Sequence, residues 1–475
     1  MPRLVVSGWR WRVALALALL PIAAVVPSGD GGPALPRSGV SAQEGTPTPT
    51  PPVAFAGIPA PQPSYETLRV EAEGEIVPYH VWIDWLPSLV TTPDGGAWVF
   101  FGAQARTEGF SPRRLYAARF DPEGSVWMPA TLMPGGVAQF GPAAAVDSTG
   151  AVHVVYSDVA AAGEIGSTLV YARSTPEGGW TNPVAIAPDP NGGYQMMADI
   201  AIDANDGVHV LWRDQRLASP DERAAHPANG DLFVSDLVDG AWTEPVRVME
   251  PGSETAVAGW PHLAANGDRL VAIWSIYGGT TEEDMKSAEQ IDWASRPLDD
   301  PAAWSASDAL LVRPDDAREI GGRLVDVATD PQGGIAIVYG SYERARNELA
   351  VRRLGADNGG WSEPEIFATG DYGYLPAIGV NAEGTIFVAF NSGRNRNVEI
   401  GAMAVFPDGS VATPVTLSPA EAGLQARATV GIGTSGAPWV VYMHQPPGES
   451  AVTELRIVRE ANLIPEVMPE VETSE

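Results

Sequence analysis

The chain has 475 residues, no cysteine and a formal net charge of −30, from 59 acidic and 29 basic residues. The lack of cysteine excludes disulfides, thiolate metal sites and a cysteine nucleophile, and the charge excludes nucleic acid and anionic membrane surfaces as partners of the whole molecule. Hydrophobic residues make up 45% of the chain, a globular proportion, and 51 glycines with 43 prolines favour a turn-rich, all-β fold.

The N-terminal 42 residues have the features of an export signal. Three arginines and no acidic residue precede an apolar run at 13–26, which is too short to span a bilayer comfortably. Small residues at Val40–Ala42 resemble a cleavage site. We therefore expect 1–42 to be either a cleaved signal peptide or an uncleaved membrane anchor, with the rest of the chain secreted or held at the cell surface.

The composition then divides the remaining chain into three parts. Residues 43–65 are rich in Pro and Thr and predict an extended, semi-rigid linker. Residues 66–460 have a globular composition, and 461–475 form an acidic tail.

A repeated hairpin organises the globular part. Nearly the same twelve residues occur at Asp147–Asp158 and at Asp203–Asp214. In each copy a run of small and branched residues leads to an Asp/Asn/Gly turn and then to a run ending in an aromatic, which predicts a β-hairpin. Seven copies, spaced by about 50 to 65 residues, begin at Leu86, Gly141, Met197, Trp260, Arg323, Leu375 and Arg427.

A second hairpin follows in most copies, with a Gly turn, a Trp and then a Pro. Because Pro is tolerated only in an edge strand, this fourth strand is expected to be the outermost. The tryptophans predict packing between neighbouring units, and they are Trp127, Trp180, Trp242, Trp304 and Trp361. Four antiparallel strands repeated in this way predict an all-β, seven-bladed β-propeller, with six blades as the alternative.

The two ends of the repeat region are expected to close the ring. The last unit has three clear strands, ending at 452–460. Residues 67–77 can supply its missing outer strand, and 462–468 are the competing segment.

Candidate ligand residues gather in the connections between second and third strands and between fourth and first strands. These connections are longer than the other turns and share one face, where binding residues usually lie. Their arginines can bind a carboxylate or sulfate, or pair with nearby acids, and their aromatics can stack on sugars. The predicted residues are Arg213, Arg216, Arg318, Arg323, Arg344, Arg346, Arg394, Arg396, Arg427, Tyr372, Tyr374 and Trp260. Four of them are expected to open onto this face near the axis, namely Arg318, Arg344, Arg394 and Arg427.

Other polar residues have competing interpretations. Asp158 and Asp214 end equivalent strands and would be either an acid–base pair or turn caps. The DANDG sequence at 203–207 hints at calcium but is explained more simply by turn chemistry. His153 and His209 occupy equivalent strand positions and are interpreted as packing or surface residues, so no metal and no cofactor is predicted.

The turn STPEGGW at Ser174–Trp180 resembles a degenerate Asp-box, the repeated turn of the sialidase-like β-propellers. The resemblance covers the repeat units and implies a glycan-active fold. In sialidases three arginines hold the substrate carboxylate beside a Tyr–Glu nucleophile pair and an acidic proton donor. The resemblance assigns no catalytic residue here, because the Arg-Ile-Pro motif is absent and most Asp-box aspartates are replaced.

The sequence therefore predicts an exported, monomeric propeller whose loop face binds an extracellular glycan or protein. An exo-sialidase or other glycoside hydrolase, and a structural surface module, are the alternative functions.

Overall fold

The computed structural model describes residues 65–459, with gaps inside that range. The gaps are 73, 82–85, 106–112, 136–137, 160–165, 177, 190, 220, 222, 224–229, 249–256, 278–287, 313–324, 331, 341–347, 357–359, 370–372, 395–396, 419–422 and 448–453. The predicted export signal, almost all of the linker and the acidic tail lie outside the described residues. Within the described part, no helix is long and apolar enough to cross a membrane.

Sheets of four antiparallel strands are the repeating unit of the fold. One sheet contains β10 (Ala138–Val146), β11 (Val152–Val159), β12 (Ser167–Arg173) and β13 (Val184–Ala185). Another contains β19 (Val257–Asn266), β20 (Arg269–Tyr277), β21 (Ala288–Pro297) and β22 (Asp308–Val312). A third contains β23 (Val325–Thr329), β24 (Ile335–Gly340), β25 (Glu348–Leu354) and β26 (Glu365–Ala368). In each sheet the hydrogen-bonded order follows the chain.

Two further sheets have the same plan with one or two strands divided. In the first, β14 (Gln195–Ile202), β15 (Val208–Asp214) and β16 (Asp231–Val238) are completed by β17 (Ala241–Trp242) and β18 (Val246–Arg247), which both pair with β16. In the second, β4 (Tyr79–Val81) and β5 (Ser88–Thr91) both pair with β6 (Ala97–Ala105), and β8 (Val126–Trp127) and β9 (Thr131–Leu132) both pair with β7 (Arg114–Asp121).

The remaining strands form an eight-stranded sheet and a small hairpin. The sheet contains β27 (Gly373–Val380), β28 (Ile386–Arg394), β29 (Asn397–Val405), β30 (Val415–Thr416), β31 (Leu424–Ile432), β32 (Pro438–Gln445), β33 (Glu454–Arg459) and β1 (Glu66–Thr67). A single parallel bridge, Val398 to Leu424, joins β29 to β31. The hairpin pairs β2 (Val70–Ala72) with β3 (Glu75–Val77).

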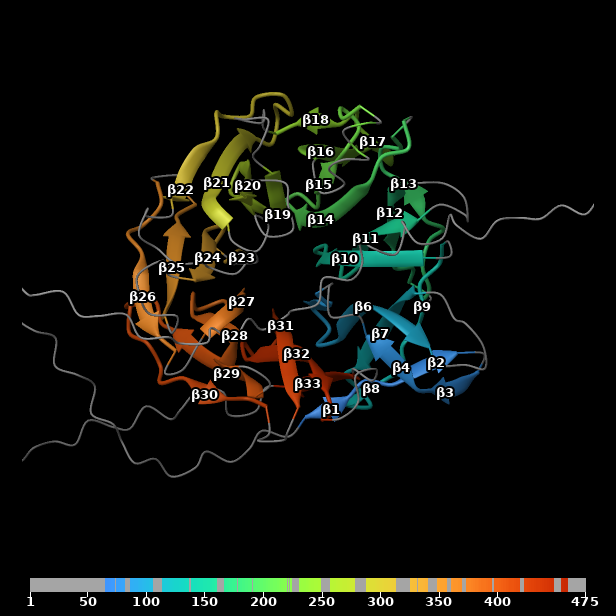
Figure 1. Cartoon of the computed structure of the whole chain (residues 1–475), viewed down its shortest axis with the longest axis vertical. Helices are drawn as coiled ribbons and strands as arrows, with labels where there is room; N and C mark the ends of the chain where they lie inside the picture. Colours follow the sequence, from blue (N-terminus) through green and yellow to red (C-terminus); the bar gives the residue numbers. More distant parts are fainter. Residues whose placement is uncertain are drawn as a thin grey trace, which may run out of the picture.

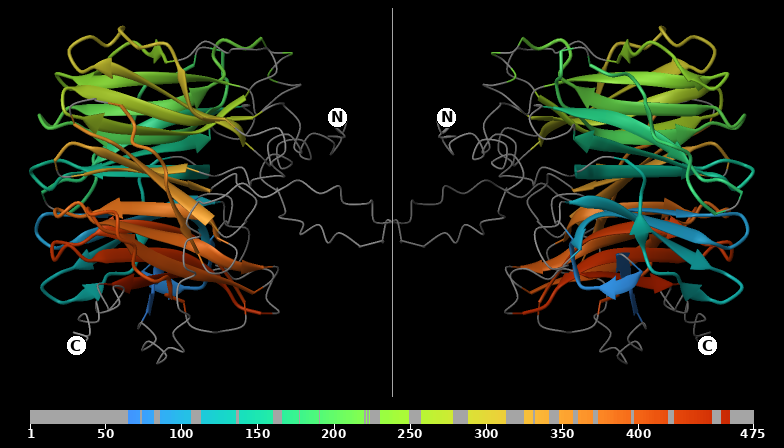
Figure 2. Two further views of the ribbon diagram at one scale, coloured as in Figure 1. Left: turned by 90° about the vertical axis from the view of Figure 1, so that its left-hand side faces the viewer. Right: turned by 90° about the vertical axis from the view of Figure 1, so that its right-hand side faces the viewer.

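The sheets are arranged radially around one axis. The first strand of each repeat, such as β10, β14, β19, β23, β27 and β31, lies nearest the centre, and short strands such as β22, β26 and β30 lie at the rim (Figure 1). Seen from the side, the strands cross a disc from one face to the other (Figure 2). The molecule is an all-β propeller of four-stranded antiparallel sheets, as the sequence predicts.

Small residues in the innermost strands are required by the crowding of neighbouring sheets. A Cβ added to Gly379 in β27 would lie 2.9 Å from side-chain atoms of Val430 and Ile432 in β31. One added to Gly431 would lie 3.0 Å from Cγ of Leu89 in β5. The second strands are buried along their whole length in β15 and β24, because they have a sheet on either side.

The predicted packing of the repeated tryptophans is confirmed where their rings are described. Trp304 packs against a buried cluster that includes Leu232 and Val234 of the preceding sheet, and each of the other four rings contacts an aromatic residue of the preceding sheet. The ring centroids are 5.5 Å apart for Trp180 and Phe100, 5.2 Å for Trp242 and Tyr171, 5.8 Å for Trp361 and Trp293, and 6.2 Å for Trp127 and Trp439. The last of these pairs joins the beginning of the repeat region to its end.

The two ends of the repeat region also pair as strands. Glu66 is opposite Ile457 and Thr67 is opposite Arg456, so β1 forms the outer strand beside β33. The expected closure is confirmed, but its extent differs from the prediction. The pairing ends at Leu68, and 70–77 turn back as the β2–β3 hairpin, because Val70 pairs with Ala130 at the rim of the first sheet. The competing segment 462–468 lies outside the described residues.

The hydroxyl of Tyr79 connects the two ends of the repeat region, and its removal should destabilise the ring. The hydroxyl of Tyr79 donates to the carbonyl of Leu68 at 2.7 Å and accepts the N–H of Leu455 at 3.1 Å. Tyr79→Phe leaves both buried backbone groups without this partner, and we expect the free energy of unfolding to fall by about 1–3 kcal/mol. Urea unfolding measures it. Tyr116→Phe is the matched control, because it removes a hydroxyl from a buried ring of the same sheet, and an equal loss there would contradict this role for Tyr79.

Candidate functional site at the propeller axis

A β-bulge recurs in the innermost strands and gives the site its geometry. The pairing of the first strand with the second shifts register between Met196 and Asp199 in β14 and between Gly259 and His262 in β19. Non-glycine residues at this bulge take the left-handed conformation, with φ of +54° at Met197, +49° at Trp260, +49° at Leu375 and +58° at Arg427. This conformation is costly for such residues, and bulges are a common means of re-aiming a side chain near a functional site.

The residue that follows the bulge connects one sheet to the next. An oxygen of Asp199 accepts the N–H of Leu263 at 2.9 Å, and an oxygen of Asp326 accepts the N–H of Ile378 at 2.8 Å. At the equivalent position of the sheet formed by β4–β9, the hydroxyl of Ser88 in β5 accepts the N–H of Ala144 at 3.1 Å. Innermost strands have an unpaired edge toward the axis, so these side chains satisfy N–H groups that no strand pairs.

Three of these positions bring titratable groups together. Nδ1 of His262 in β19 lies 3.5 Å from an oxygen of Asp199 in β14 and 3.8 Å from an oxygen of Asp326 in β23. The three strands are neighbours around the axis (Figure 1). The side chains keep 27%, 21% and 29% exposure for Asp199, His262 and Asp326, so water reaches them. We call these three residues the axial cluster.

The axial cluster is built to retain protons. Burial alone would lower the pKa of His262, but the hydrogen bond to Asp199 and the charges of Asp199 and Asp326 raise it above 6.5. Burial raises the pKa of Asp326, and the nearby His262 only partly offsets this. The cluster therefore presents carboxylate acceptors and an imidazole that stays protonated to a higher pH than usual.

Sequence reasoning missed the axial cluster, although its signal was present. When the repeats are aligned on their turns, Asp199, His262 and Asp326 fall at the same position of three successive copies. The three residues are more than 60 positions apart in the chain, so only the register of the repeats relates them. Among the described residues, no group of three His, Asp or Glu side chains is placed to hold a metal ion.

The predicted ligand residues divide into three groups. Six lie outside the described residues, namely Arg318, Arg323, Arg344, Arg346, Arg396 and Tyr372, and the side chain of Arg394 also lies outside them. Trp260 and Tyr374 lie beside the bulges of the inner strands and are half-buried. Arg427 is only 6% exposed, which differs from the open position expected for it. The bulge explains this, because it fixes the main chain of Arg427 inside β31, where its N–H donates to Asn391.

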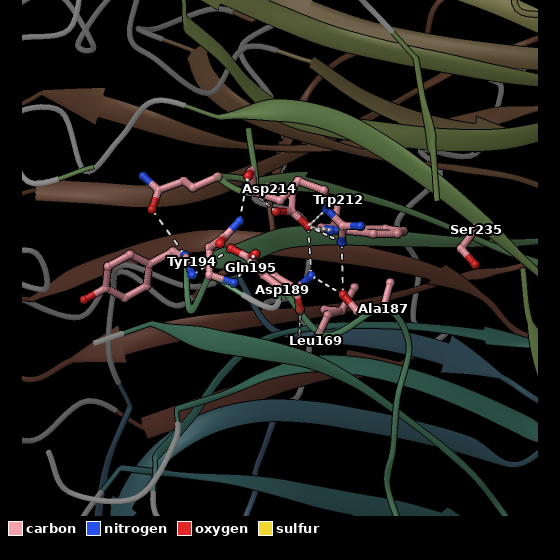
Figure 3. Close-up of polar contacts among 12 residues, drawn as sticks. Leu169, Ala187, Asp189, Tyr194, Gln195, Trp212, Asp214 and Ser235 are labelled. Carbon is pink, nitrogen blue, oxygen red and sulfur yellow. Dashed lines mark hydrogen bonds and ion pairs between the residues drawn. The ribbon is translucent and has the colours of Figure 1, made fainter. Parts of the chain in front are cut away.

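Asp214, at the end of β15, forms a structural network with Arg216. Figure 3 shows Asp214 beside Trp212 and Gln195. The Asp214 carboxylate accepts hydrogen bonds from Arg216 Nη2 at 2.7 Å, Trp212 Nε1 at 2.7 Å and Gln195 Nε2 at 2.8 Å, and it is fully buried. It also accepts the main-chain N–H of Arg216 at 2.7 Å. These bonds connect Asp214 to both strands and to the turn that follows, which favours the turn-cap interpretation over the acid–base one, and Arg216 is engaged by this carboxylate.

The histidines noted in the sequence have structural partners. His209 lies between Asp203 at 3.2 Å and Asp236 at 2.7 Å. His153 lies between Asp147 at 3.1 Å and the Tyr171 hydroxyl at 2.7 Å. Asp203 also accepts two N–H groups within the DANDG turn, which agrees with turn chemistry as its explanation.

Comparisons with known proteins relate the chain only to distant structures. No family model matches the sequence, and no curated protein matches it. Among solved structures, a protein of unknown function from Dyadobacter fermentans is 11% identical over 84% of this chain and 98% of its own, with a TM-score of 0.47. An ulvan lyase of polysaccharide lyase family PL25 is 12% identical over 80% and 94%, with a TM-score of 0.47.

An α-L-arabinofuranosidase of Fusarium graminearum in complex with arabinobiose is likewise similar. It is 12% identical over 83% of this chain and 97% of its own, with a TM-score of 0.45. None of these likenesses transfers an activity to this chain.

The axial cluster should make stability fall as pH rises above 6.5. Because the folded-state pKa of His262 is raised, its contribution is complete below the unfolded value near 6.5 and is lost as pH rises through the folded value. The raised pKa of Asp326 acts in the same direction. We expect His262→Gln to flatten the decline in unfolding free energy between about pH 6.5 and 8.5, measured by urea unfolding at each pH.

His153→Gln is the control for this pH dependence. Burial lowers the pKa of His153, so its contribution changes only as pH falls below 6.5. An equal flattening by both variants would contradict the assignment to His262.

Proposed function

We propose that the protein is an exported seven-bladed β-propeller that binds an extracellular ligand at its axis, a glycan in the first place and a protein in the second. The blade count is supported by the eight-stranded sheet. It consists of two sets of sequential antiparallel strands, which are joined by only a single parallel bridge. Together with the five other sheets of four to six strands, these two sets match the seven hairpins of the sequence.

The axial cluster is the observation that carries the proposed binding function. Carboxylates accept hydrogen bonds from pairs of sugar hydroxyls, and a protonated imidazole donates to ring or hydroxyl oxygens. Asp199, His262 and Asp326 combine these groups at the meeting point of three blades while remaining within reach of water. The ring of Trp260, two residues before His262 at the bulge, supplies an apolar surface of the kind on which sugars stack.

A glycoside hydrolase, of exo-sialidase or another type, is the second candidate. The raised pKa of Asp326 beside the carboxylate of Asp199 favours it, because glycosidases pair one proton-holding carboxyl with one ionised carboxylate. The degenerate Asp-box turn at Ser174–Trp180 supports membership of the sialidase-like propellers. A structural surface module without ligand is the third candidate.

Export is part of the proposal and rests on the sequence. The basic and apolar segments of 1–42 and the Pro/Thr-rich linker at 43–65 support a secreted or membrane-tethered monomer. The lack of cysteine means that the fold does not depend on an oxidising compartment.

A glycan array and a fluorogenic sialoside assay, both with the full chain, test the proposed function. We expect at least one glycan to bind, and we expect His262→Gln and Asp199→Asn to weaken it about tenfold or more, which corresponds to about 1.4 kcal/mol. Asn keeps an oxygen that can accept the N–H of Leu263, so the second variant changes charge without losing that contact. Hydrolysis that is lost in Asp326→Asn would favour the glycosidase.

Ser88→Ala is the matched control for binding. It removes the equivalent hydrogen bond between two other blades and leaves the axial cluster intact. Equal binding by all variants, or no binding by the wild type, would contradict a ligand site at the axial cluster.

A further inference from the structure

Arg213 is buried without an anionic partner. It is the penultimate residue of β15, and only 3% of it is exposed. Its Nη2 donates to the sulfur of Met196 at 2.9 Å, and its Nη1 is buried without a hydrogen-bond partner. Among the described residues, no carboxylate forms an ion pair with it. A thioether is a weak acceptor, so Nη2 is poorly satisfied and Nη1 keeps its hydrogen-bonding capacity unused.

Two other arginines of this region, one buried and one half-buried, have a carboxylate partner. Arg296 donates to both oxygens of Asp236, at 2.6 and 2.7 Å, and Arg216 donates to Asp214. Asp214 is next to Arg213 in the chain, but its oxygens are occupied by Arg216, Trp212 and Gln195 (Figure 3). The local carboxylate is therefore committed elsewhere.

An uncompensated buried cation is costly, and Arg213 remains a cation. Burial lowers its pKa to about 10, which leaves the guanidinium charged at neutral pH. Removing one partner of a buried ion pair strongly destabilises a protein, and Arg213 resembles the residue left behind by such a removal.

The surroundings leave room for this side chain. A Cβ at Gly230 would lie 2.8 Å from Cγ of Arg213, and a Cβ at Gly259 would lie 2.9 Å from the ring of Tyr277. Tyr277 belongs to the next sheet and raises the pKa of Arg213 through its charge interaction, so the guanidinium lies between two blades. Glycines at both positions thus admit an arginine and a tyrosine side by side.

We propose that Arg213 is an oxyanion subsite, which receives a carboxylate or sulfate group of the ligand. The planar guanidinium can donate two parallel hydrogen bonds to such a group, from Nη1 and Nη2, with Met196 displaced. Met196 is opposite Arg213 and Asp199 is opposite Leu211, so the subsite lies two residues of β15, or about 7 Å, along the strand from the axial cluster. This rests on the proposed function and specifies it: the ligand carries an acidic group about one sugar unit away from the part held at the axis.

Replacement of Arg213 by an apolar side chain of similar length tests the subsite. We expect Arg213→Met to raise the Tm in oxyanion-free chloride buffer by about 2 °C or more, because an uncompensated charge is removed. Sodium glucuronate and sodium sulfate, at matched ionic strength, should raise the Tm of the wild type and not that of Arg213→Met. The two salts distinguish a carboxylate from a sulfate ligand, and methyl glucoside at the same concentration is the neutral control.

Arg216→Met is the matched control, because Arg216 has a carboxylate partner in the same segment. It should lower the Tm and retain the response to oxyanions. If Arg213→Met also lowers the Tm, or responds to the salts as the wild type does, the subsite is wrong. If Arg213→Met does not fold, Arg213→Lys decides, since a lysine without the planar fork should respond less than the wild type and an undiminished response would overturn the proposal.

Failure of the subsite is distinguishable from failure of the proposed function. Neutral glycans that bind the wild type, bind Arg213→Met equally and lose affinity in His262→Gln would leave the axial site standing and remove only the oxyanion subsite.

Discussion

The unpaired inner edge of the first strand in each blade is the constraint on which the rest of the structure depends. A radial sheet must end somewhere near the axis, and the last strand there has N–H groups that no further strand can satisfy. This chain satisfies several of them with a side chain from the neighbouring blade, as Ser88, Asp199 and Asp326 do for the next inner strand. The same positions that hold adjacent blades together therefore also place polar groups around the axis.

The side chains that join adjacent blades at the axis also keep hydrogen-bonding capacity that a ligand could use. A carboxylate that bonds a neighbouring N–H uses only part of its capacity, because a carboxylate has about four acceptor sites. Asp199 and Asp326 each keep sites directed at His262, and all three remain partly exposed. Asp214, by contrast, is fully buried and its carboxylate accepts hydrogen bonds from Gln195, Trp212 and Arg216. The difference between the two settings, more than residue type, separates a carboxylate that is free to accept a ligand from a structural one.

Much of the fold could be predicted from the sequence, because hairpin turns and edge prolines are local signals. Turn residues located the hairpins, prolines identified the outer strand, and the repeated Trp predicted packing between blades, as Trp180 against Phe100 shows. The candidate site could not be predicted in the same way. The arginines were predicted from charge along the chain. Charge does not reveal that Arg216 has a carboxylate partner two residues away, while Arg213 has none among the described residues. The axial cluster required the register of three blades, including bulges that are not visible in the sequence.

Ring closure by the two ends of the chain has a consequence for biogenesis. Arg459 in β33 donates a hydrogen bond to Glu66 in β1, 393 positions earlier in the sequence. During synthesis, β1 therefore has no partner until β33 has been made. Until then a nascent chain has open sheet edges at both ends of the partial ring, which are templates for pairing with another chain. No disulfide can hold the intermediate together, since the chain has no cysteine. Ribosomes that stall late in this chain would therefore release the most aggregation-prone fragments, whereas early truncations would leave shorter and more easily degraded ones.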